Sequence, residues 1–294
     1  MTTSPVTEDH PLGTFPLGSH DSWQFHFYSS ELDRFFSVRM WASNSVHQAW
    51  AWTSTLKEEC PNQEMIAHLD ACEFHSSEPS ATRASQAGED GTHFLFSETS
   101  NTKHCGSLSV SVSSQIVLNI NFSPRKICFW QVPGQTEGVF HFPNLEATIE
   151  YQGKSVHAFG YCKRYWGDYD GPWGYQFIQG GAADEKTFLW TADATFVGQD
   201  EYNYFKVLDG DTGVVEEADK TDTYHNNQRA FWRPVEGPKW EAELSPCGKM
   251  MFPLTSATQH SRLFERFGRV QLKKDGQVVF NGFGFNEICF GTVA

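Results

Sequence analysis

The chain has 294 residues, with 22 Lys and Arg against 36 Asp and Glu, and a formal net charge of −14. This charge would repel a polyphosphate backbone, so we expect no nucleic-acid partner. The sequence lacks a run of eighteen apolar residues and an apolar segment behind a basic start, so we expect no membrane span and no signal peptide and predict a cytoplasmic protein. The seven cysteines are scattered without a C-x-x-C pair, which argues against a disulfide scaffold and a zinc cluster.

Aromatic residues make up 15% of the chain, with 25 Phe and 10 Trp, whereas strong helix formers are sparse. That balance favours strands and bulky pockets. In the first half, strand patterns occur at residues 23–28, 35–41, 49–53, 93–96, 108–112 and 116–122. The longest candidate helix covers residues 55–72, and the polar segment 76–91 predicts a surface loop.

The second half begins with a predicted β-hairpin, in which Gln152-Gly153 forms the turn between residues 147–151 and 155–166. Asp209–Gly213 and Lys274–Gly276 predict further hairpin turns. Additional strands are predicted at residues 173–179, 187–196, 202–208, 230–233, 239–244, 263–273 and 277–290. Many short strands joined by Gly and Asp turns predict an all-β protein, a two-lobed β-barrel or β-sandwich with few short helices. A boundary at residues 132–138 would separate an N-terminal lobe, residues 15–135, from a C-terminal lobe, residues 136–294.

Residues 155–179 form the segment that is densest in reactive and aromatic side chains. If residues 155–166 are extended, Tyr161, Lys163 and Tyr165 share one face, and Arg164 and Trp166 lie on the other. Residues 173, 175, 177 and 179 of the next strand also share a face. Such a wall can bind a flat or polyene ligand and direct a few donors at it. The alternative is that these aromatic side chains fill a β-sandwich core.

The C-terminal run has the same alternation. Asn281, Phe283, Phe285 and Glu287 fall on one side, while Gly282 and Gly284 allow a backbone or a ligand to approach the other side. Glu287 is therefore either an acid in a pocket or a residue at its rim.

Other types of site find little support. The sequence has no phosphate-binding loop, dinucleotide fingerprint or nucleophile elbow. The histidines lack metal-ligand spacing, so we expect neither a cofactor nor a metal. Asp168 and Asp170 could hold calcium, but we favour an acidic turn made rigid by Pro172.

Two strings resemble a known superfamily. They are GYCKRYWG at residues 160–167, followed by Trp173-Gly174, and GFGFNE at residues 282–287. Both resemble strands of the lipocalin-like superfamily that includes bacterial hydroxyneurosporene synthases and AttH-type proteins. The resemblance implies a two-lobed fold with both strings in the second lobe and a ligand between or within the lobes. Lys163 and Arg164 stand where many relatives have Glu-His, so this strand lacks an acid that could protonate an alkene.

The pattern also resembles another branch of this superfamily, the fungal lipocalin-like pericyclases, which include hetero-Diels-Alderases of tropolone sesquiterpenoid pathways. The resemblance implies a cofactor-free cycloaddition that joins a quinone methide to a humulene-type sesquiterpene. Holding two reactants in one geometry can contribute roughly 7 to 11 kcal/mol at the upper limit. A donor on the carbonyl oxygen would stabilise the charge that develops there.

For this reaction, the candidate hydrogen-bond donors are Lys163, Arg164, Tyr165 and Arg233. The candidate substrate contacts are Tyr161, Trp166, Trp173, Tyr175, Gln176, Trp190, Trp232, Phe283, Phe285 and Glu287. Each cation has the alternative role of a surface charge or a structural salt bridge, and an exposed pair would contribute only about 0 to 1 kcal/mol.

Two other functions remain open. One is a terpenoid hydratase or isomerase that uses Glu287 or Asp193 as its acid. The other is a carrier with a wholly apolar cavity. All three functions imply an apolar small molecule as the partner.

Overall fold

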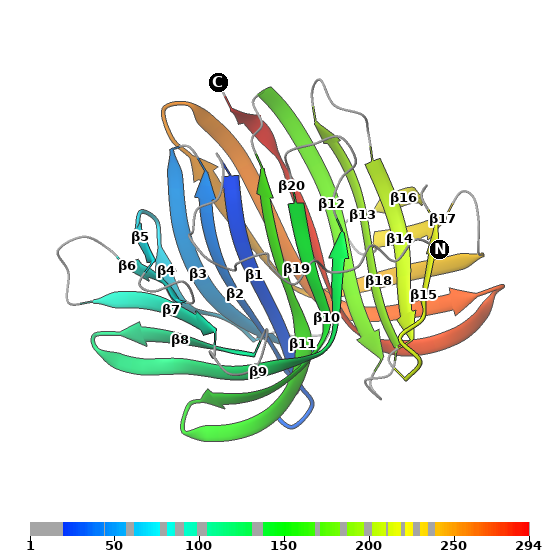
Figure 1. Ribbon diagram of the computed structural model, residues 1–294, viewed down its shortest axis with the longest axis horizontal. Helices are drawn as coiled ribbons and strands as arrows, with labels where there is room; N and C mark the ends of the chain where they lie inside the picture. The colour runs from blue at the N-terminus through cyan, green and yellow to red at the C-terminus, as the bar shows by residue number, and fades with distance from the viewer. Residues whose placement is uncertain are drawn as a thin grey trace. The chain divides into compact units, whose positions relative to one another are not determined.

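The computed structural model describes residues 20–43, 45–56, 62–76, 81–85, 91–98, 105–130, 138–167, 171–182, 187–196, 202–209, 211–218, 221–225, 230–234 and 239–293 (Figure 1). The chain divides into two compact units, Met1–Thr53 with Glu64–Tyr169, and Ser54–Gln63 with Asp170–Ala294. The described residues form strands and turns and include no helix, so the predicted all-β class is confirmed. Within this part of the chain, no helix could span a lipid bilayer.

The first unit contains an eleven-stranded sheet in the order β4-β3-β2-β1-β11-β10-β9-β8-β7-β6-β5. Its strands are β1 (His20–Ser29), β2 (Arg34–Ser43), β3 (Val46–Thr55), β4 (Gln63–Leu69), β5 (Glu73–Ser76), β6 (Ala81–Ser85), β7 (Thr92–Glu98), β8 (Gly106–Val112), β9 (Gln115–Trp130), β10 (Gly138–Tyr151) and β11 (Lys154–Gly167).

This sheet curls over its own apolar core (Figure 1). The rings of Trp23 and Phe96 lie 4.9 Å apart, and those of Phe25 and Phe122 lie 5.6 Å apart. These pairs join β1 to β7 and β9, which are not its neighbours in the sheet. The alternate residues Trp23, Phe25 and Phe27 therefore face the core, and the residues between them face the other way.

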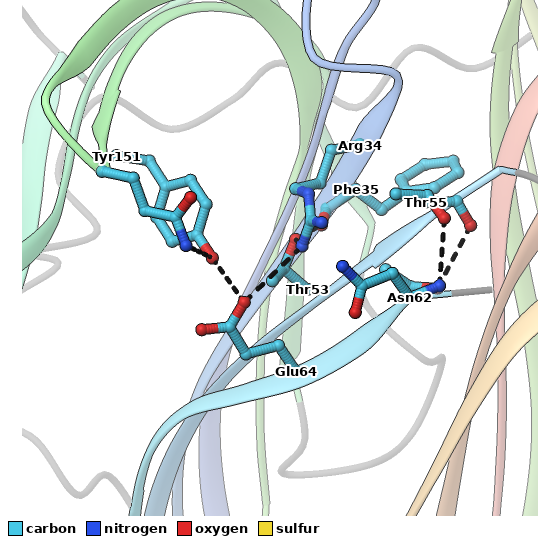
Figure 2. Close-up of polar contacts among 9 residues, drawn as sticks. Arg34, Phe35, Thr53, Thr55, Asn62, Glu64 and Tyr151 are labelled. Atoms are coloured by element: carbon cyan, nitrogen blue, oxygen red, sulfur yellow. Dashed lines mark hydrogen bonds and ion pairs between the residues drawn. The ribbon is translucent and has the colours of Figure 1, made fainter.

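A polar cluster connects strands across the same curl (Figure 2). Tyr151 O–H donates to Glu64 Oε2 at 2.8 Å, and Arg34 Nη1 lies 3.9 Å from the same oxygen. Arg34 Nη1 also donates to Thr53 Oγ1 at 3.4 Å. Burial raises the pKa of Tyr151 to about 12, and the hydrogen bond to Glu64 is the second contribution. Residues of β2, β3, β4 and β10 are joined in this way.

The second unit contains a nine-stranded sheet in the order β15-β14-β13-β12-β20-β19-β18-β17-β16. Its strands are β12 (Gly171–Ala182), β13 (Thr187–Phe196), β14 (Tyr202–Asp209), β15 (Val215–Ala218), β16 (Thr221–His225), β17 (Ala230–Pro234), β18 (Trp240–Thr255), β19 (Gln259–Lys274) and β20 (Gln277–Val293).

The two ends of the second sheet approach each other. Glu216 of β15 accepts hydrogen bonds from Trp240 Nε1 at 3.2 Å and from Lys274 Nζ at 2.9 Å. β14 also contacts β16 and β17, which lie at the far edge of the sheet. A second core, which includes Ile178 and Val270, is enclosed in this way.

The predicted turns are present. Gln152 and Gly153 have φ of 50° and 75°, and Asp275 and Gly276 have φ of 50° and 78°. Two successive residues with positive φ match the type I′ hairpin turn, whose twist fits that of the strands. Gly213, with φ of 74°, serves the turn after β14.

Two local predictions were wrong. The candidate helix at 55–72 is replaced by the end of β3 and by β4, because paired neighbouring strands override a weak helical pattern. The expected loop at 76–91 contains β6, which pairs with β5 and β7. Ala84 of β6 joins the core, and this burial explains why a polar segment forms a strand.

The chain passes from the first sheet to the second at a later residue than the lobe boundary that was predicted from the sequence. β10 and β11, residues 138–167, belong to the first sheet, and the second sheet begins at Gly171. Whether residues 15–135 and 136–294 fold as separate domains stays a prediction.

Candidate functional site

The register of β1 and β11 determines which side chains share a face. Lys163 pairs with Gln24, and Tyr161 pairs with His26. On the opposite face Arg164 pairs with Trp23. The predicted alternation of residues 155–166 is confirmed, and the odd-numbered residues face away from the apolar core, which contains Val156, Ala158 and Cys162.

β10 adds an imidazole to this face. His141 lies opposite Lys163, and a hydrogen bond joins its Nδ1 to Tyr161 O–H. From the other side, the His26 ring stacks on Tyr161 with centroids 6.4 Å apart and planes 16° from parallel. His141, Tyr161 and His26 are each at most 1% exposed. Three strands thus bring two imidazoles and a phenol together.

β2 and β3 extend the same face with a cation between aromatic rings. Arg39 pairs with Gln24 in the register, and its Nη2 donates to Ser22 Oγ at 3.2 Å. The Arg39 guanidinium lies 4.8 Å from the Trp41 ring and 5.8 Å from the Trp50 ring. Such contacts hold the planar cation in one orientation.

We call this surface of the first sheet the polar face. It is made of buried polar groups beside buried aromatic rings, namely Gln24, His26, Arg39, Trp41, Trp50, His141, Tyr161 and Lys163. Burying polar groups costs free energy, so their concentration on one face favours a function for them. An ammonium has three N–H donors, so Lys163 can donate to a ligand oxygen while it keeps a protein partner.

Arg164 lies on the core side. Its Nη2 and Nε donate to the two carboxylate oxygens of Asp21 at 2.6 and 3.1 Å. Both side chains are without exposed surface, and the guanidinium lies 5.1 Å from the Trp23 ring. This geometry favours the structural salt bridge for Arg164.

The next two predicted residues of β11 are also divided between the faces. Tyr165 is partly exposed on the side of the polar face, where its ring lies 5.5 Å from that of His20. Trp166 is partly exposed and packs against the apolar core.

Several predicted residues of the second sheet lie together on β12 and β20. The Trp173 and Tyr175 rings stack 5.8 Å apart, and Tyr175 O–H donates to Glu287 Oε1. Glu287 pairs in register with Glu265 of β19, and both carboxyl groups are fully buried. Glu287 is therefore a buried residue rather than a residue of an exposed rim.

The remaining predicted residues have different surroundings. Phe285 is buried with its ring 5.2 Å from that of Phe267, and Phe283 is partly exposed two positions away on the same face. Gln176 lies on the opposite face of β12 from Tyr175, because neighbouring residues of a strand alternate. Gly284 makes the predicted close approach, because a Cβ there would lie 2.6 Å from the Gln179 carbonyl oxygen.

Some predictions fall outside the described residues. The side chains of Trp190, Asp193, Trp232 and Arg233 are not described. The Asp168 and Asp170 loop also lies outside the described residues. In the part of the chain that is described, His, Cys, Asp and Glu form no cluster of three that could hold a metal ion.

The sequence analysis missed His26, Arg39 and His141 as site residues, because the histidines were weighed only as metal ligands and because residues 35–41 were interpreted only as a strand. A signal was present in β1. Ser22, Gln24 and His26 alternate with the aromatic residues at 23, 25 and 27, and this polar side includes neither Lys nor Glu, whereas a solvated face would be rich in both.

Solved structures identify the fold. CghA aligns with a TM-score of 0.62 at 10% identity, over 94% of this chain and 88% of CghA. A putative AttH from Nitrosomonas europaea aligns with a TM-score of 0.55 at 12% identity, over 98% of both chains. Kievitone hydratase from Nectria haematococca aligns with a TM-score of 0.54 at 10% identity, over 98% of this chain and 95% of the hydratase. The fold is lipocalin-like.

The resemblance predicted from two short strings is thereby confirmed as a likeness of fold. No protein-family model matches the sequence. No curated protein matches it either. In this lipocalin-like chain the two strings lie in different sheets, because GYCKRYWG is in β11 of the first sheet and GFGFNE is in β20 of the second.

Proposed function

We propose that the protein is a cofactor-independent cyclase of natural-product biosynthesis. Its reaction is an intermolecular hetero-Diels-Alder cycloaddition between a tropolone-type quinone methide and a humulene-type sesquiterpene. The observation that carries this proposal is the polar face, where Lys163 and Tyr161 lie among buried aromatic and imidazole rings.

The chemistry requires little from the protein beyond binding and polarisation. The C=C–C=O unit of the quinone methide and one C=C of the sesquiterpene form two new σ bonds, and no atom leaves. The reaction needs no oxidant or reductant. Aromatic walls would hold the two reactants in one geometry, and Lys163 would donate a hydrogen bond to the carbonyl oxygen as it gains negative charge.

Two structural neighbours support an enzyme rather than a carrier. CghA is a pericyclase, and the other is named a kievitone hydratase. The particular substrates of the proposal come from the sequence resemblance to pericyclases of tropolone sesquiterpenoid pathways.

A hydratase or isomerase is the second candidate, and the His141–Tyr161 pair is the observation that favours it. The replacement of Glu-His by Lys163-Arg164 removes an acid from β11, but β10 brings an imidazole to the same face. A histidine bonded to a tyrosine can relay a proton to or from a bound substrate. The buried Glu287 bonded to Tyr175 is a second acid candidate on the other sheet.

The test is product analysis with purified protein and no added cofactor or metal. The protein is given a precursor of a tropolone quinone methide together with a humulene alcohol, and adducts are identified by mass spectrometry and NMR. Faster formation of one stereoisomer than in the protein-free control supports the proposal.

Two other results would point elsewhere. Incorporation of ¹⁸O from labelled water into the terpenoid would favour the hydratase. Unchanged rate and product ratio, with saturable quenching of Trp fluorescence, would contradict this activity and favour a carrier.

A further inference from the structure

The second unit has a cleft that the proposed reaction does not use. It has a volume of about 500 Å³ and lies over the ends of β18, β19 and β20. Its apolar lining includes Met251, Pro253 and Phe290, and its polar lining includes His260 and Arg262. We call it the basic cleft.

Strand register shows that the basic cleft belongs to one face of the sheet. Arg262 pairs with Pro253 on one side and with Phe290 on the other. Paired residues of antiparallel strands share a face. Phe264 and Arg266 follow Arg262 on this face at the alternate positions of β19, because side chains alternate along a strand.

Large apolar side chains are exposed at this cleft. Met251 is 51% exposed and Phe290 is 48% exposed. The Phe290 ring stacks on Phe264 with centroids 6.0 Å apart. Exposed apolar side chains that adjoin one another are typical of a binding surface.

The charged residues that β18, β19 and β20 place on this face near the cleft are cationic, although the whole chain is acidic. Lys249 pairs in register with Arg266, so the face carries Lys249, Arg262 and Arg266, with His260 beside them. β19 and β20 contribute no carboxylate to it, because Glu265 and Glu287 occupy alternate positions on the other face. A local concentration of cations in a protein of net charge −14 favours an anionic ligand.

Within the described part of the chain, Arg262 differs from other cations in its charge partners. Arg34, Arg164 and Lys274 each lie within 4.0 Å of a carboxylate, at 3.9, 2.6 and 2.9 Å. Among the described residues, Arg262 makes no ion pair.

Arg266 is 9% exposed, and its Nε donates to Asn286 Oδ1 at 2.7 Å. Its Nη2 has no hydrogen-bond partner in the described part of the chain. A buried guanidinium donor without an acceptor is costly unless an acceptor arrives.

We propose that the basic cleft binds a small organic anion with an apolar body, namely a free alkyl or aryl carboxylate. The apolar body lies against Phe290 and Met251. The carboxylate accepts charge-assisted hydrogen bonds from Arg262, and Arg266 adds positive potential from within the same face. The cleft thus gives the protein a second small-molecule site, independent of the polar face.

The test uses a fluorescent probe, 11-(dansylamino)undecanoate, with its methyl ester as the uncharged control. The full chain should bind the carboxylate at least about tenfold more tightly than the ester, and salt should weaken this preference. Arg262→Gln should remove most of the preference. Phe290→Ala should weaken binding of both probes. Both residues are exposed, so these variants should fold like the wild type.

The matched control is Arg269→Gln, an exposed arginine on the opposite face of β19, which should leave binding unchanged. Equal binding of the acid and the ester would overturn the proposal. Loss of binding in Lys163→Met with retention in Arg262→Gln would also overturn it, since the probe would then occupy the polar face. A dimer in sedimentation that Phe290→Ala abolishes, with no probe binding, would assign the cleft to self-association instead.

Discussion

Lys163 and Arg164 are adjacent cations on β11, yet they lie in opposite environments. Arg164 faces the apolar core and forms a bidentate pair with Asp21. Lys163 faces His141 across the β10–β11 register, two positions from Tyr161. The comparison shows that the face of a strand, rather than the type of charge, separates a structural cation from a candidate catalytic one.

Substitution of Arg164, the cation on the core side of β11, should have the largest effect on stability. Arg164→Met removes the charge and the two hydrogen bonds that the guanidinium gives the buried Asp21 carboxylate, and should lower the free energy of unfolding by about 3 to 5 kcal/mol, measured by urea denaturation. Replacing both partners, as in Arg164→Met with Asp21→Leu, should recover much of the loss. A single-variant loss below about 1 kcal/mol would show that the pair is not structural.

Substitution of Lys163, the cation on the polar face, should affect activity more than stability. If Lys163 donates to the reacting carbonyl, Lys163→Met should slow adduct formation by about 10²- to 10³-fold. The free energy of unfolding should fall less in Lys163→Met than in Arg164→Met. Lys154→Met, at the exposed start of β11, is the matched control and should keep wild-type activity.

The His141–Tyr161 pair separates the two candidate reactions. In a cycloaddition, Tyr161→Phe and His141→Gln should each slow the reaction by about tenfold, a loss of roughly one hydrogen bond, and leave the pH profile unchanged in shape. In acid-base catalysis, each loss should reach about 10²- to 10⁴-fold and remove one limb of the profile. Rates measured from pH 5 to 9 in both variants decide between them.

The smallest effect is expected at the Tyr151–Glu64 bond, which joins strands away from the polar face (Figure 2). Tyr151→Phe should lower the free energy of unfolding by about 0.5 to 1.5 kcal/mol. The pKa of Tyr151 rises from 10.0 to about 12 on folding, so the folded chain holds this proton more tightly. That contribution to stability is complete below pH 10 and is lost as the pH rises toward 12.

Urea denaturation of the wild type and Tyr151→Phe from pH 8 to 11.5 checks this sign. The difference between the two proteins should shrink above pH 10, and a constant difference would contradict it. Comparing the two proteins cancels the titration of other tyrosines and lysines.

The alternation along single strands could be predicted from sequence. The two faces of residues 155–166 and the turns at Gln152-Gly153 and Asp275-Gly276 follow from local patterns, and all are present. The strings at residues 160–167 and 282–287 together carried the resemblance to the lipocalin-like fold, which is confirmed.

Neighbouring strands were harder to predict, because their order depends on contacts between residues far apart in the chain. His141 is 22 positions from Lys163 and Arg39 is 124 positions away, counted from their numbers in the chain, yet both lie on the same face as Lys163. The segments 55–72 and 76–91 were predicted incorrectly for the same reason, because pairing and burial decided their structure.

The sequence by itself determined that the protein is all-β, where two of its hairpins turn, and which side chains alternate on β11, because these features depend on residues a few positions apart. Only the tertiary structure decided which face of β11 meets the core. It also paired Arg164 with Asp21, brought His141 to Tyr161, and left the Arg266 Nη2 without an acceptor among the described residues. These outcomes depend on strand order and register, which local periodicity does not contain.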